Sequence, residues 1–451
     1  MMHFSTDQQT LNDLMVFGKP GANSILSLFN KTLTSGGAEK LADMFRYPMA
    51  DFEGINTRSK IIQYFAVKKL AFPFQPALFD VIEQYLSNTD ERSKLQPRES
   101  SVSEKLKGLV VADPHTKSIN DGVTALRQLL ADLQRFFADP DFGQNTGTDG
   151  QHPYSAEVQP MQALLQDADL NGFMEENAGK TLSYTAVAGY DVLLRFKKRD
   201  KIRSCLQAIY QLDVYLSVAG IAVQRGFCYP DAMPAERGEV VFEGVYHPFV
   251  KGAVANSLRI DPQGNVIFLT GANMAGKSTL MKSLGTAMYL AHMGFPVPAK
   301  AMSFSVREGI YTSINLPDNL GRGMSHFYAE VLRIKKVSQE LGQNKHLFII
   351  IDELFRGTNV KDAYEATVAI TSAFAAKRNC MFVMSTHIME AGDTLKQRCN
   401  NINFVYLPTK MDGKLPVYTY RLEKGITADR HGMIIINNEG ILDILNKKLS
   451  I

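Results

Sequence analysis

Cysteine is scarce in this chain and follows no metal-binding pattern. Only four cysteines occur among 451 residues, Cys205, Cys228, Cys380 and Cys399, and no two of them form a C-x-x-C pair. Disulfide frameworks and structural zinc sites need cysteines that are numerous or closely spaced. The scarcity argues against both, and we expect reduced thiols in a cytoplasmic protein.

Neither sign of charge is in excess, and long apolar runs are lacking. The chain has 49 basic and 46 acidic residues, for a formal net charge of +3. This balance neither requires nor excludes a nucleic-acid partner, so any basic binding face has to be local. Residues 1–10 are polar and lack the apolar core of a signal peptide. No apolar run reaches membrane-spanning length, so we expect no membrane partner.

The two halves of the sequence differ in their apolar periodicity. Stretches such as 121–137 and 201–223 have apolar residues at helical spacing. From Val240 onward, short β-branched runs alternate with helical patterns. This change predicts a helical domain at 1–235 and an α/β domain with a mostly parallel sheet at 236–451. The best strand candidates are residues 240–242, 266–269, 347–351 and 381–384.

The segment T-G-A-N-M-A-G-K-S-T at residues 270–279 is the most informative motif. It spells G-x-x-x-x-G-K-S between a strand pattern and a helical pattern, the context that a phosphate-binding loop requires. Backbone N–H groups and a helix N-terminus there form a nest for phosphates. Lys277 is predicted to pair with the β- and γ-phosphates, and Ser278 to ligate Mg²⁺. The predicted nucleotide-binding residues of the loop are Gly271, Ala272, Asn273, Met274, Ala275, Gly276, Lys277, Ser278 and Thr279.

Polar residues follow two further apolar strand patterns. Asp352 and Glu353 come directly after residues 347–351. Alone, such acids could begin a solvated loop, but beside a phosphate loop they predict a Mg²⁺ ligand at Asp352 and a general base at Glu353. His387 ends the strand pattern of residues 381–387, at the sheet edge where open α/β folds bind ligands. We interpret it as a γ-phosphate sensor.

These motifs resemble those of the ATPase domain of the MutS DNA mismatch-repair family, within the ABC-type ATPases. Residues 270–279 are similar to the family's TG-x-NM-x-GKST loop, and residues 352–358 to its DE-x-GRGT motif. Further similarities are Ser385-Thr386-His387 to ATH, Tyr246-His247-Pro248 to the opening HP dipeptide, and Pro298-Ala299 to VPA. The resemblance implies ATP and Mg²⁺ as cofactors, and it implies that Asn256 belongs to the nucleotide site.

Residues 324–330, M-S-H-F-Y-A-E, are similar to the family's STF-x-x-E signature. In that family the serine and its helix N-terminus reach the γ-phosphate of a partner subunit, which unpaired N–H groups and the helix dipole stabilise. The resemblance therefore implies that Ser325 completes a composite site in a homodimer. An N-cap serine of a surface helix is the alternative interpretation.

The helical half also resembles the family. Residues 27–41, Pro48-Met49 and residues 55–58 are similar to the start of its core domain. This implies a core and lever domain at 1–235, with levers at roughly 87–201. We expect the family's N-terminal mismatch-reading domains, and any domain beyond Ile451, to be missing from this chain. The likeness of Phe52-Glu53-Gly54 to the F-x-E mismatch wedge is then superficial and a coincidence.

Several residues depart from the family pattern. Ala253 stands where relatives carry an adenine-stacking aromatic, and Tyr420 is a candidate substitute. Phe355 replaces the first glycine of GRGT, and Ser313 stands where arginine is common. The densest basic cluster, residues 195–201, is either a non-specific phosphate contact or a solvated helix face.

The combined pattern predicts a MutS-like ATPase that uses ATP to drive conformational change on DNA, in mismatch repair or related repair and recombination. Other repair proteins are further candidate partners. One alternative is an ATP-driven switch that acts on a protein partner without mismatch recognition. A transporter ATPase subunit is another, although the Asn273-Met274 pair and the helical half argue against it.

Overall fold

The computed structural model describes residues 4–18, 23–95, 114–139, 142, 153–175, 181–314, 326–355, 357–412, 415–427 and 441–446. The chain forms two compact units that interleave along the sequence. The sheet unit comprises Met1–Leu28, Phe45–Ser59 and Ala222–Ile451, and the helical unit comprises Phe29–Met44 and Lys60–Ile221. The first residues of the chain thus group with the C-terminal half, whereas the sequence pattern placed them in a domain at 1–235.

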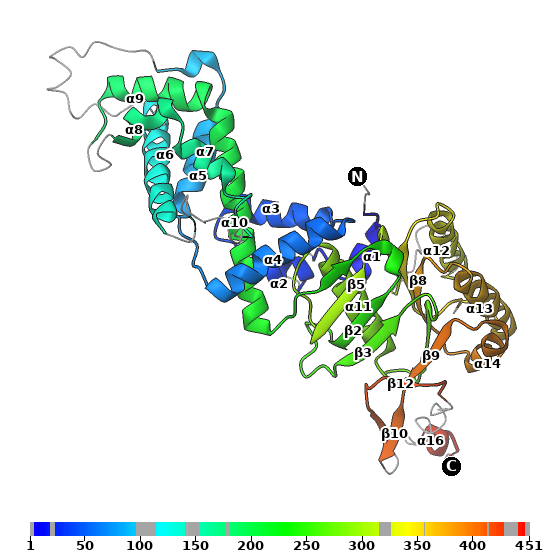
Figure 1. Cartoon of the computed structure of the whole chain (residues 1–451). Coiled ribbons are helices and arrows are strands. Elements are labelled where there is room, and N and C mark those ends of the chain that lie inside the picture. Colours follow the sequence, from blue (N-terminus) through cyan, green and yellow to red (C-terminus); the bar gives the residue numbers. More distant parts are fainter. Residues whose placement is uncertain are drawn as a thin grey trace. The chain divides into compact units, whose positions relative to one another are not determined.

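The helical unit is built from long amphipathic helices. Helix α6 (Pro114–Ala138) buries Val123, Leu126 and Leu130, which recur at helical spacing. It packs closely on α5 (Ala77–Ser87), because a Cβ at Gly122 would lie 2.3 Å from the Tyr85 ring. Figure 1 shows these helices beside α10. The other elements with residues in this unit are α3 (Ser35–Arg46), α4 (Phe52–Lys68), η1 (Glu91–Ser93), α7 (Gln159–Leu165), η2 (Ala168–Leu170), α8 (Asn171–Glu175), α9 (Tyr184–Asp191), the π-helical η3 (Val192–Lys197) and α10 (Arg199–Arg225).

Helix α10 is long and apolar enough to cross a membrane by length and composition alone, which the sequence analysis did not anticipate. However, 72% of its most apolar window is buried inside the protein. Within the described residues, helix α10 is therefore packed as a core helix is.

The main sheet of the sheet unit has the strand order β12-β9-β4-β8-β7-β6. All neighbours from β9 to β6 pair in parallel, and the short β12 is antiparallel to β9. The strands are β4 (Val266–Gly271), β6 (Gly309–Ser313), β7 (Leu347–Ile351), β8 (Met381–Ser385), β9 (Ile402–Leu407) and β12 (Glu423–Lys424). Parallel strands end at the same edge, so the residues that follow β4, β7 and β8 gather there.

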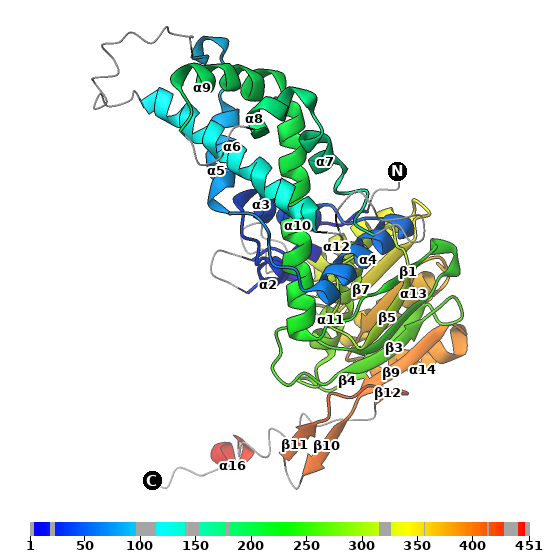
Figure 2. The same ribbon diagram turned by 60° about the vertical axis from the view of Figure 1, so that its left-hand side comes forward.

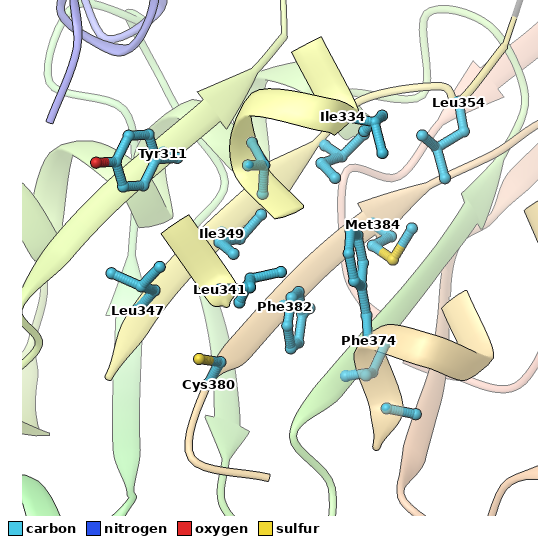
Figure 3. Packing of buried hydrophobic residues seen from close by; sticks show 14 of the residues in the cluster. Tyr311, Ile334, Leu341, Leu347, Ile349, Leu354, Phe374, Cys380, Phe382 and Met384 are labelled. Carbon is cyan, nitrogen blue, oxygen red and sulfur yellow. The ribbon is translucent and has the colours of Figure 1, made fainter. Parts of the chain in front are cut away.

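Helices cover this sheet and bury its apolar strands. They are α11 (Lys277–His292), α12 (His326–Leu341), α13 (Val360–Ala375) and α14 (Met389–Arg398). Strands β4, β6, β7 and β8 are buried along their whole length, as parallel strands with both faces covered are. Figure 3 shows Ile349 and Phe382 packed with Leu341 of α12 and Phe374 of α13. The rings of Phe374 and Phe382 stack with centroids 4.7 Å apart.

A second sheet has the order β1-β5-β2-β3. Its strands are β1 (Asp231–Met233), β2 (Val240–Val245), β3 (Asn256–Ile260) and β5 (Ala301–Ser305). The strand predicted at 240–242 forms as β2, but it pairs antiparallel with β3 and β5 outside the parallel sheet. A ribbon of β10 (Thr409–Asp412) and β11 (Leu415–Tyr418) follows β9, as Figure 2 shows, and α16 (Ile441–Asn446) is the last described element.

The N-terminal residues belong to the sheet unit because they cover the edge of β6. Ser5 forms a parallel bridge with Gly309, and α1 (Gln8–Asp13) packs against β6. A short helix, α2 (Ile25–Phe29), follows. An edge strand leaves its outer backbone N–H and carbonyl groups without hydrogen-bonding partners. Here the N-terminal segment supplies such partners to β6. The sequence pattern contained no signal for this long-range pairing.

Candidate functional site

The predicted phosphate loop connects β4 to α11. Three of its residues, Gly271, Met274 and Gly276, have positive φ angles of 148°, 66° and 98°. Gly276 is the N-cap of α11 and offers no capping side chain. The first N–H groups of the helix therefore lack a side-chain acceptor at this cap, which is the arrangement that binds anions at helix N-termini.

Lys277 folds back onto its own loop. Its side chain is buried, and Nζ donates hydrogen bonds to the carbonyl oxygens of Gly271 at 3.0 Å and Ala272 at 3.2 Å. Charged phosphate oxygens form stronger hydrogen bonds with an ammonium group than neutral carbonyls do, so they can replace the carbonyls as its acceptors. Ser278 is half-buried in the first turn of α11, next to this group.

The last residue of β8 holds the acidic pair. Asp352 follows β7 and is buried, and its Oδ1 accepts a hydrogen bond from the Ser385 hydroxyl. The backbone N–H of Glu353 donates to the carbonyl and the hydroxyl of Ser385, both at 3.2 Å. Because β8 lies between β4 and β7, Ser278 and Asp352 follow strands on either side of it. The family motif has alanine where this chain has Ser385, and that departure was the sequence signal for a role that the sequence analysis missed.

Glu353 and His387 contact each other directly. His387 Nε2 lies 2.5 Å from Glu353 Oε1, and the two side chains are 39% and 15% exposed. Glu353 also has a φ of 54°, a left-handed conformation that costs a non-glycine residue about 1–3 kcal/mol. The structure thus brings the predicted base and the predicted sensor together at the edge where β7 and β8 end.

Phe355, the residue that departs from the family's glycine, is also left-handed, with a φ of 62°. Its ring is buried against Phe327 at the start of α12, with centroids 5.6 Å apart. Gly357 approaches the same helix so closely that a Cβ there would lie 2.7 Å from the Phe327 nitrogen. The start of α12 therefore packs on the loop that follows the acidic pair.

The side-chain amide of Asn256 is engaged by the protein backbone. Its Nδ2 donates to the carbonyl of Tyr420 at 2.9 Å, and its Oδ1 accepts from the N–H of Leu422 at 2.7 Å. Tyr420 has a φ of 55°, and its ring lies 3.0 Å from the position of a Cβ on Gly276. Asn256 thus holds Tyr420 beside the phosphate loop, while its predicted contact with a nucleotide stays a prediction.

A pocket of about 540 Å³ opens beside the loop. Its volume is typical of small-molecule sites. Ala253 lines it and leaves room where an aromatic would stand, and Tyr420 lines it as well. His247, so far only part of the Tyr246-His247-Pro248 motif, also lines the pocket, and burial together with the charge of Lys282 lowers its pKa. The remaining lining residues are Val245, Val250, Lys251, Gly252, Val254, Asn256, Met274, Ala275, Gly276, Thr279, Leu280, Ser283 and Leu407.

Ser325 lies outside the described residues, so its role across a dimer stays a prediction. Ser313, the position where arginine is common, accepts the N–H of Asp352 at 2.8 Å through its carbonyl oxygen. A backbone contact does not depend on the side chain, so this departure leaves the position of Asp352 unchanged.

Much of the basic cluster at 195–201 is neutralised within the helical unit. Arg195 is 1% exposed and pairs with Asp191 at 2.6 Å. Lys198 and Lys201 both bind Asp167, at 2.8 Å and 2.5 Å. These residues of the cluster form structural ion pairs, which leaves them poorly placed to neutralise phosphates.

The comparison with protein families concerns the sheet unit. The model of the family MutS domain V matches residues 267–447. This range begins in β4 and contains the phosphate loop, Asp352, Glu353 and His387.

Several curated relatives are called DNA mismatch repair protein MutS. That of Persephonella marina is 28% identical over 268 residues, which are 57% of this chain and 30% of the relative. The proteins of Fusobacterium nucleatum and Chlamydia pneumoniae are 29% and 28% identical over 55% and 54% of the chain, covering 28% and 30% of their own lengths. The matched part of the chain therefore spans at most 30% of these relatives.

Proposed function

Since the chain is a MutS-like protein that carries a MutS domain V, we propose that it binds ATP with Mg²⁺ and hydrolyses it to drive conformational change on DNA. The process is mismatch repair or a related repair or recombination reaction, in the cytoplasm. One observation supports this most directly. The anion nest at the start of α11 and the Asp352–Glu353 pair follow strands on either side of β8 at one edge of the sheet.

The residues at this edge suit a magnesium nucleotide. The Ser278 hydroxyl and the Asp352 carboxylate are the hard oxygen donors that Mg²⁺ prefers, and Mg²⁺ usually takes few protein ligands beside phosphate and water. The ion neutralises charge on the phosphates. Lys277 exchanges its two carbonyl acceptors for β- and γ-phosphate oxygens.

Glu353 and His387 have different roles in the attack of water on the γ-phosphate. The two side chains are hydrogen-bonded to each other. With ATP bound, Glu353 accepts the proton of the water, and His387 donates a hydrogen bond near the γ-phosphate. The step produces ADP and phosphate, with the proton held first on the Glu353 carboxylate.

Tyr420 is placed to stack on the adenine base in the pocket. It takes the role that an aromatic near Ala253 has in relatives, and Asn256 holds its backbone. Base–aromatic stacking contributes about 1–3 kcal/mol. The ring is 44% exposed, which leaves a face available to a base.

The wider assembly follows from the family resemblance. The chain acts as a homodimer in which Ser325 completes the partner's site. The helical unit within residues 1–235 forms the core and lever domain, with levers at roughly 87–201, and residues 236–451 form the ATPase domain, with which the first residues of the chain pack. ATP binding and hydrolysis move the levers relative to the DNA, with other repair proteins as partners.

The ion pairs of the basic cluster favour a second candidate function, an ATP-driven switch that acts on a protein partner. Arg195, Lys198 and Lys201 already have carboxylate partners, which reduces the cationic surface for DNA. The two functions differ in their dependence on salt, because each phosphate contact releases counterions.

Both proposals can be tested with one set of measurements. ATP hydrolysis and DNA binding are measured with homoduplex, mismatched and branched DNA, across a salt series, with and without ATP. Stimulated hydrolysis and binding that weakens steeply with salt support the DNA function. Hydrolysis without any DNA binding favours the protein-directed switch, and a protein that neither binds nor hydrolyses ATP refutes both.

A further inference from the structure

The first described residues of the chain form a clasp on the edge of the main sheet. We call residues 5–13 the N-terminal clasp. Ser5 begins it: its N–H donates to Glu308 at 2.8 Å, and its carbonyl accepts from Ile310 at 3.0 Å. Gly309 lies between these two, and a Cβ there would lie 2.4 Å from the Ser5 hydroxyl. The start of β6 is thus paired as though a further strand were present.

Side chains of the clasp bind the end of β6. The Thr10 hydroxyl accepts the N–H of Thr312 at 2.9 Å. Asp13 Oδ2 accepts the Thr312 hydroxyl at 2.7 Å and the N–H of Ile314 at 2.9 Å. Thr10, Asp13 and Thr312 are at most 2% exposed. Buried hydrogen bonds of this kind are costly to leave unmade, so the clasp and the end of β6 move together.

Asp7 joins the clasp to α12. It is the N-cap of α1 and accepts the N–H of Thr10 at 3.0 Å. The same carboxylate binds the guanidinium of Arg333 and, at 2.8 Å, the ammonium of Lys336. The side chains of Asp7 and Arg333 are only 10% and 6% exposed. Burial alone would raise the pKa of Asp7, but hydrogen bonds from the two cations outweigh it and hold the pKa well below its usual range.

Arg333 also ties α12 back to β6, since its Nε donates to the Thr312 carbonyl at 3.1 Å. One carboxylate, one guanidinium and one strand residue therefore connect three elements. Charge-assisted hydrogen bonds are about twice as strong as neutral ones, and the fork of an arginine restricts their direction. We call this contact of Asp7, Arg333 and Thr312 the junction, and it sets how α12 lies on the edge of the sheet.

Two contacts connect this junction to the acidic pair. The carbonyl of Ser313, the residue after Thr312, accepts the N–H of Asp352 at 2.8 Å. Less than two helical turns before Arg333, Phe327 packs on Phe355, two residues beyond Glu353. The left-handed conformations of Glu353 and Phe355 persist only if surrounding structure imposes them. Both β6 and α12 supply such structure.

We propose that Asp7 is a positioning residue for ATP hydrolysis, which keeps Asp352 and Glu353 in place by joining β6 to α12. The inference rests on the proposed ATPase function. Asp7 touches neither the nucleotide nor the water and acts only through β6 and α12. Misplacement of reacting groups by about 1 Å can lower a rate by about 100-fold, so the loss of this junction affects the chemical step more than binding.

The test compares two matched variants. Asp7→Asn keeps the size of the side chain and its capping oxygen but loses the charge that holds Arg333 and Lys336. Asp167→Asn is the control, because Asp167 is likewise a buried N-cap bound by two cations, Lys198 and Lys201, in the helical unit. We expect kcat to fall about tenfold in Asp7→Asn, with KM and the Kd of a non-hydrolysable ATP analogue changed less than about twofold. Asp167→Asn should leave all three near the wild-type values.

A second set of variants separates positioning from stability. Arg333→Gln breaks the same junction from the side of α12, so the double variant with Asp7→Asn should lose no more activity than either single variant. Hydrogen–deuterium exchange should increase in α12 and at residues 309–314 in each. If Asp7→Asn does not fold, Arg333→Lys, which keeps the charge but loses the fork, carries the comparison.

The possible outcomes separate a positioning role of Asp7 from a binding defect and from a failure of the proposed ATPase function. A kcat of Asp7→Asn equal to that of Asp167→Asn, or additive losses in the double variant, would overturn the positioning role alone. An equal rise in KM and fall in affinity would overturn it too, because that result indicates a binding defect. A wild-type protein that does not hydrolyse ATP overturns the proposed function, and the positioning role with it.

Discussion

His387 Nε2 lies 2.5 Å from Glu353 Oε1, so the predicted sensor and the predicted base are hydrogen-bonding partners. Each of them follows a different strand of the main sheet, β8 and β7. The contact is made by one of the two oxygens of the carboxylate that we propose as the proton acceptor in hydrolysis. The pair lies at the edge of the sheet where both strands end, and this makes the carboxylate of Glu353 the first target for mutation.

Replacement of Glu353 by Gln should abolish turnover and preserve ATP binding. The amide keeps the size of the side chain but cannot accept the proton, so we expect kcat to fall at least about 100-fold. Steady-state hydrolysis and equilibrium binding of ATP measure the two effects. Glu365→Gln on the exposed face of α13 is the matched control and should be silent. Residual hydrolysis close to wild type would show that another group is the base.

Asn256 and Tyr420 should act on the nucleotide as one unit. Tyr420→Ala removes the stacking ring and should weaken the binding of adenine nucleotides about tenfold, whereas Tyr420→Phe should keep it. Asn256→Ala releases the backbone of Tyr420 and Leu422 and should weaken binding to a similar or smaller extent. Titration with a fluorescent adenine nucleotide gives each Kd. Fully additive losses in the double variant would contradict a role of Asn256 through Tyr420.

Position 355 should tolerate glycine better than alanine. Phe355→Ala loses the buried ring at a cost of about 3–5 kcal/mol and keeps an unfavourable φ of 62°. Phe355→Gly loses the same ring but recovers about 1–2 kcal/mol of backbone strain. The lost packing is the larger effect, so both variants are less stable than wild type, with Gly the less affected. Urea unfolding of the three proteins measures this order, and an alanine variant as stable as the glycine variant would contradict the strain.

His292 should make the sheet unit less stable in mild acid. It is fully buried in α11, where Nδ1 contacts the Met288 carbonyl at 2.7 Å and Nε2 accepts the N–H of Arg307 at 2.9 Å. Burial, to which the charge of Arg307 adds, lowers the pKa of His292 to about 4.

The sign of this effect follows from the two pKa values. The unfolded state takes up a proton as the pH falls below about 6.5, while the folded state does not until about 4. The contribution of neutral His292 to the free energy of unfolding is therefore complete above pH 6.5. It decreases by up to about 3 kcal/mol as the pH falls from 6.5 to 4. Urea unfolding at pH 7, 6 and 5 measures it. His292→Gln should flatten this dependence, and His115→Gln, at an exposed position of α6, should leave it unchanged.

The phosphate loop and the acidic pair were predictable because the segments that carry them are contiguous in sequence. A strand pattern, a turn with glycines at positions of positive φ and a helix follow one another around Lys277, and the structure has β4, the loop and α11 in that order. The strands predicted at 266–269, 347–351 and 381–384 also formed, since each is a short apolar run. Parallel pairing then brings Asp352, Ser385 and the loop to one edge.

Other parts of the site depend on residues far apart in the sequence. Asn256 and Tyr420 meet beside the loop through hydrogen bonds that span more than 160 residues, and no spacing rule indicates such a contact. The strand at 240–242 was predicted correctly as a strand, but only tertiary pairing decided that it joins β3 and β5. The basic residues at 195–201 looked like one cluster, and folding paired Arg195 with Asp191.

The sequence by itself determined the candidate chemistry of this protein, because groups that are to face a phosphate or a metal ion have to stand at fixed positions of a local strand–loop–helix turn. Only the tertiary structure decided what supports that chemistry. Asp7 reaches Arg333, and Ser385 reaches Asp352, because the edge of β6 and the buried carboxylate each required hydrogen-bonding partners. Many residues could have met those requirements, so the choice among them became visible only in the folded chain.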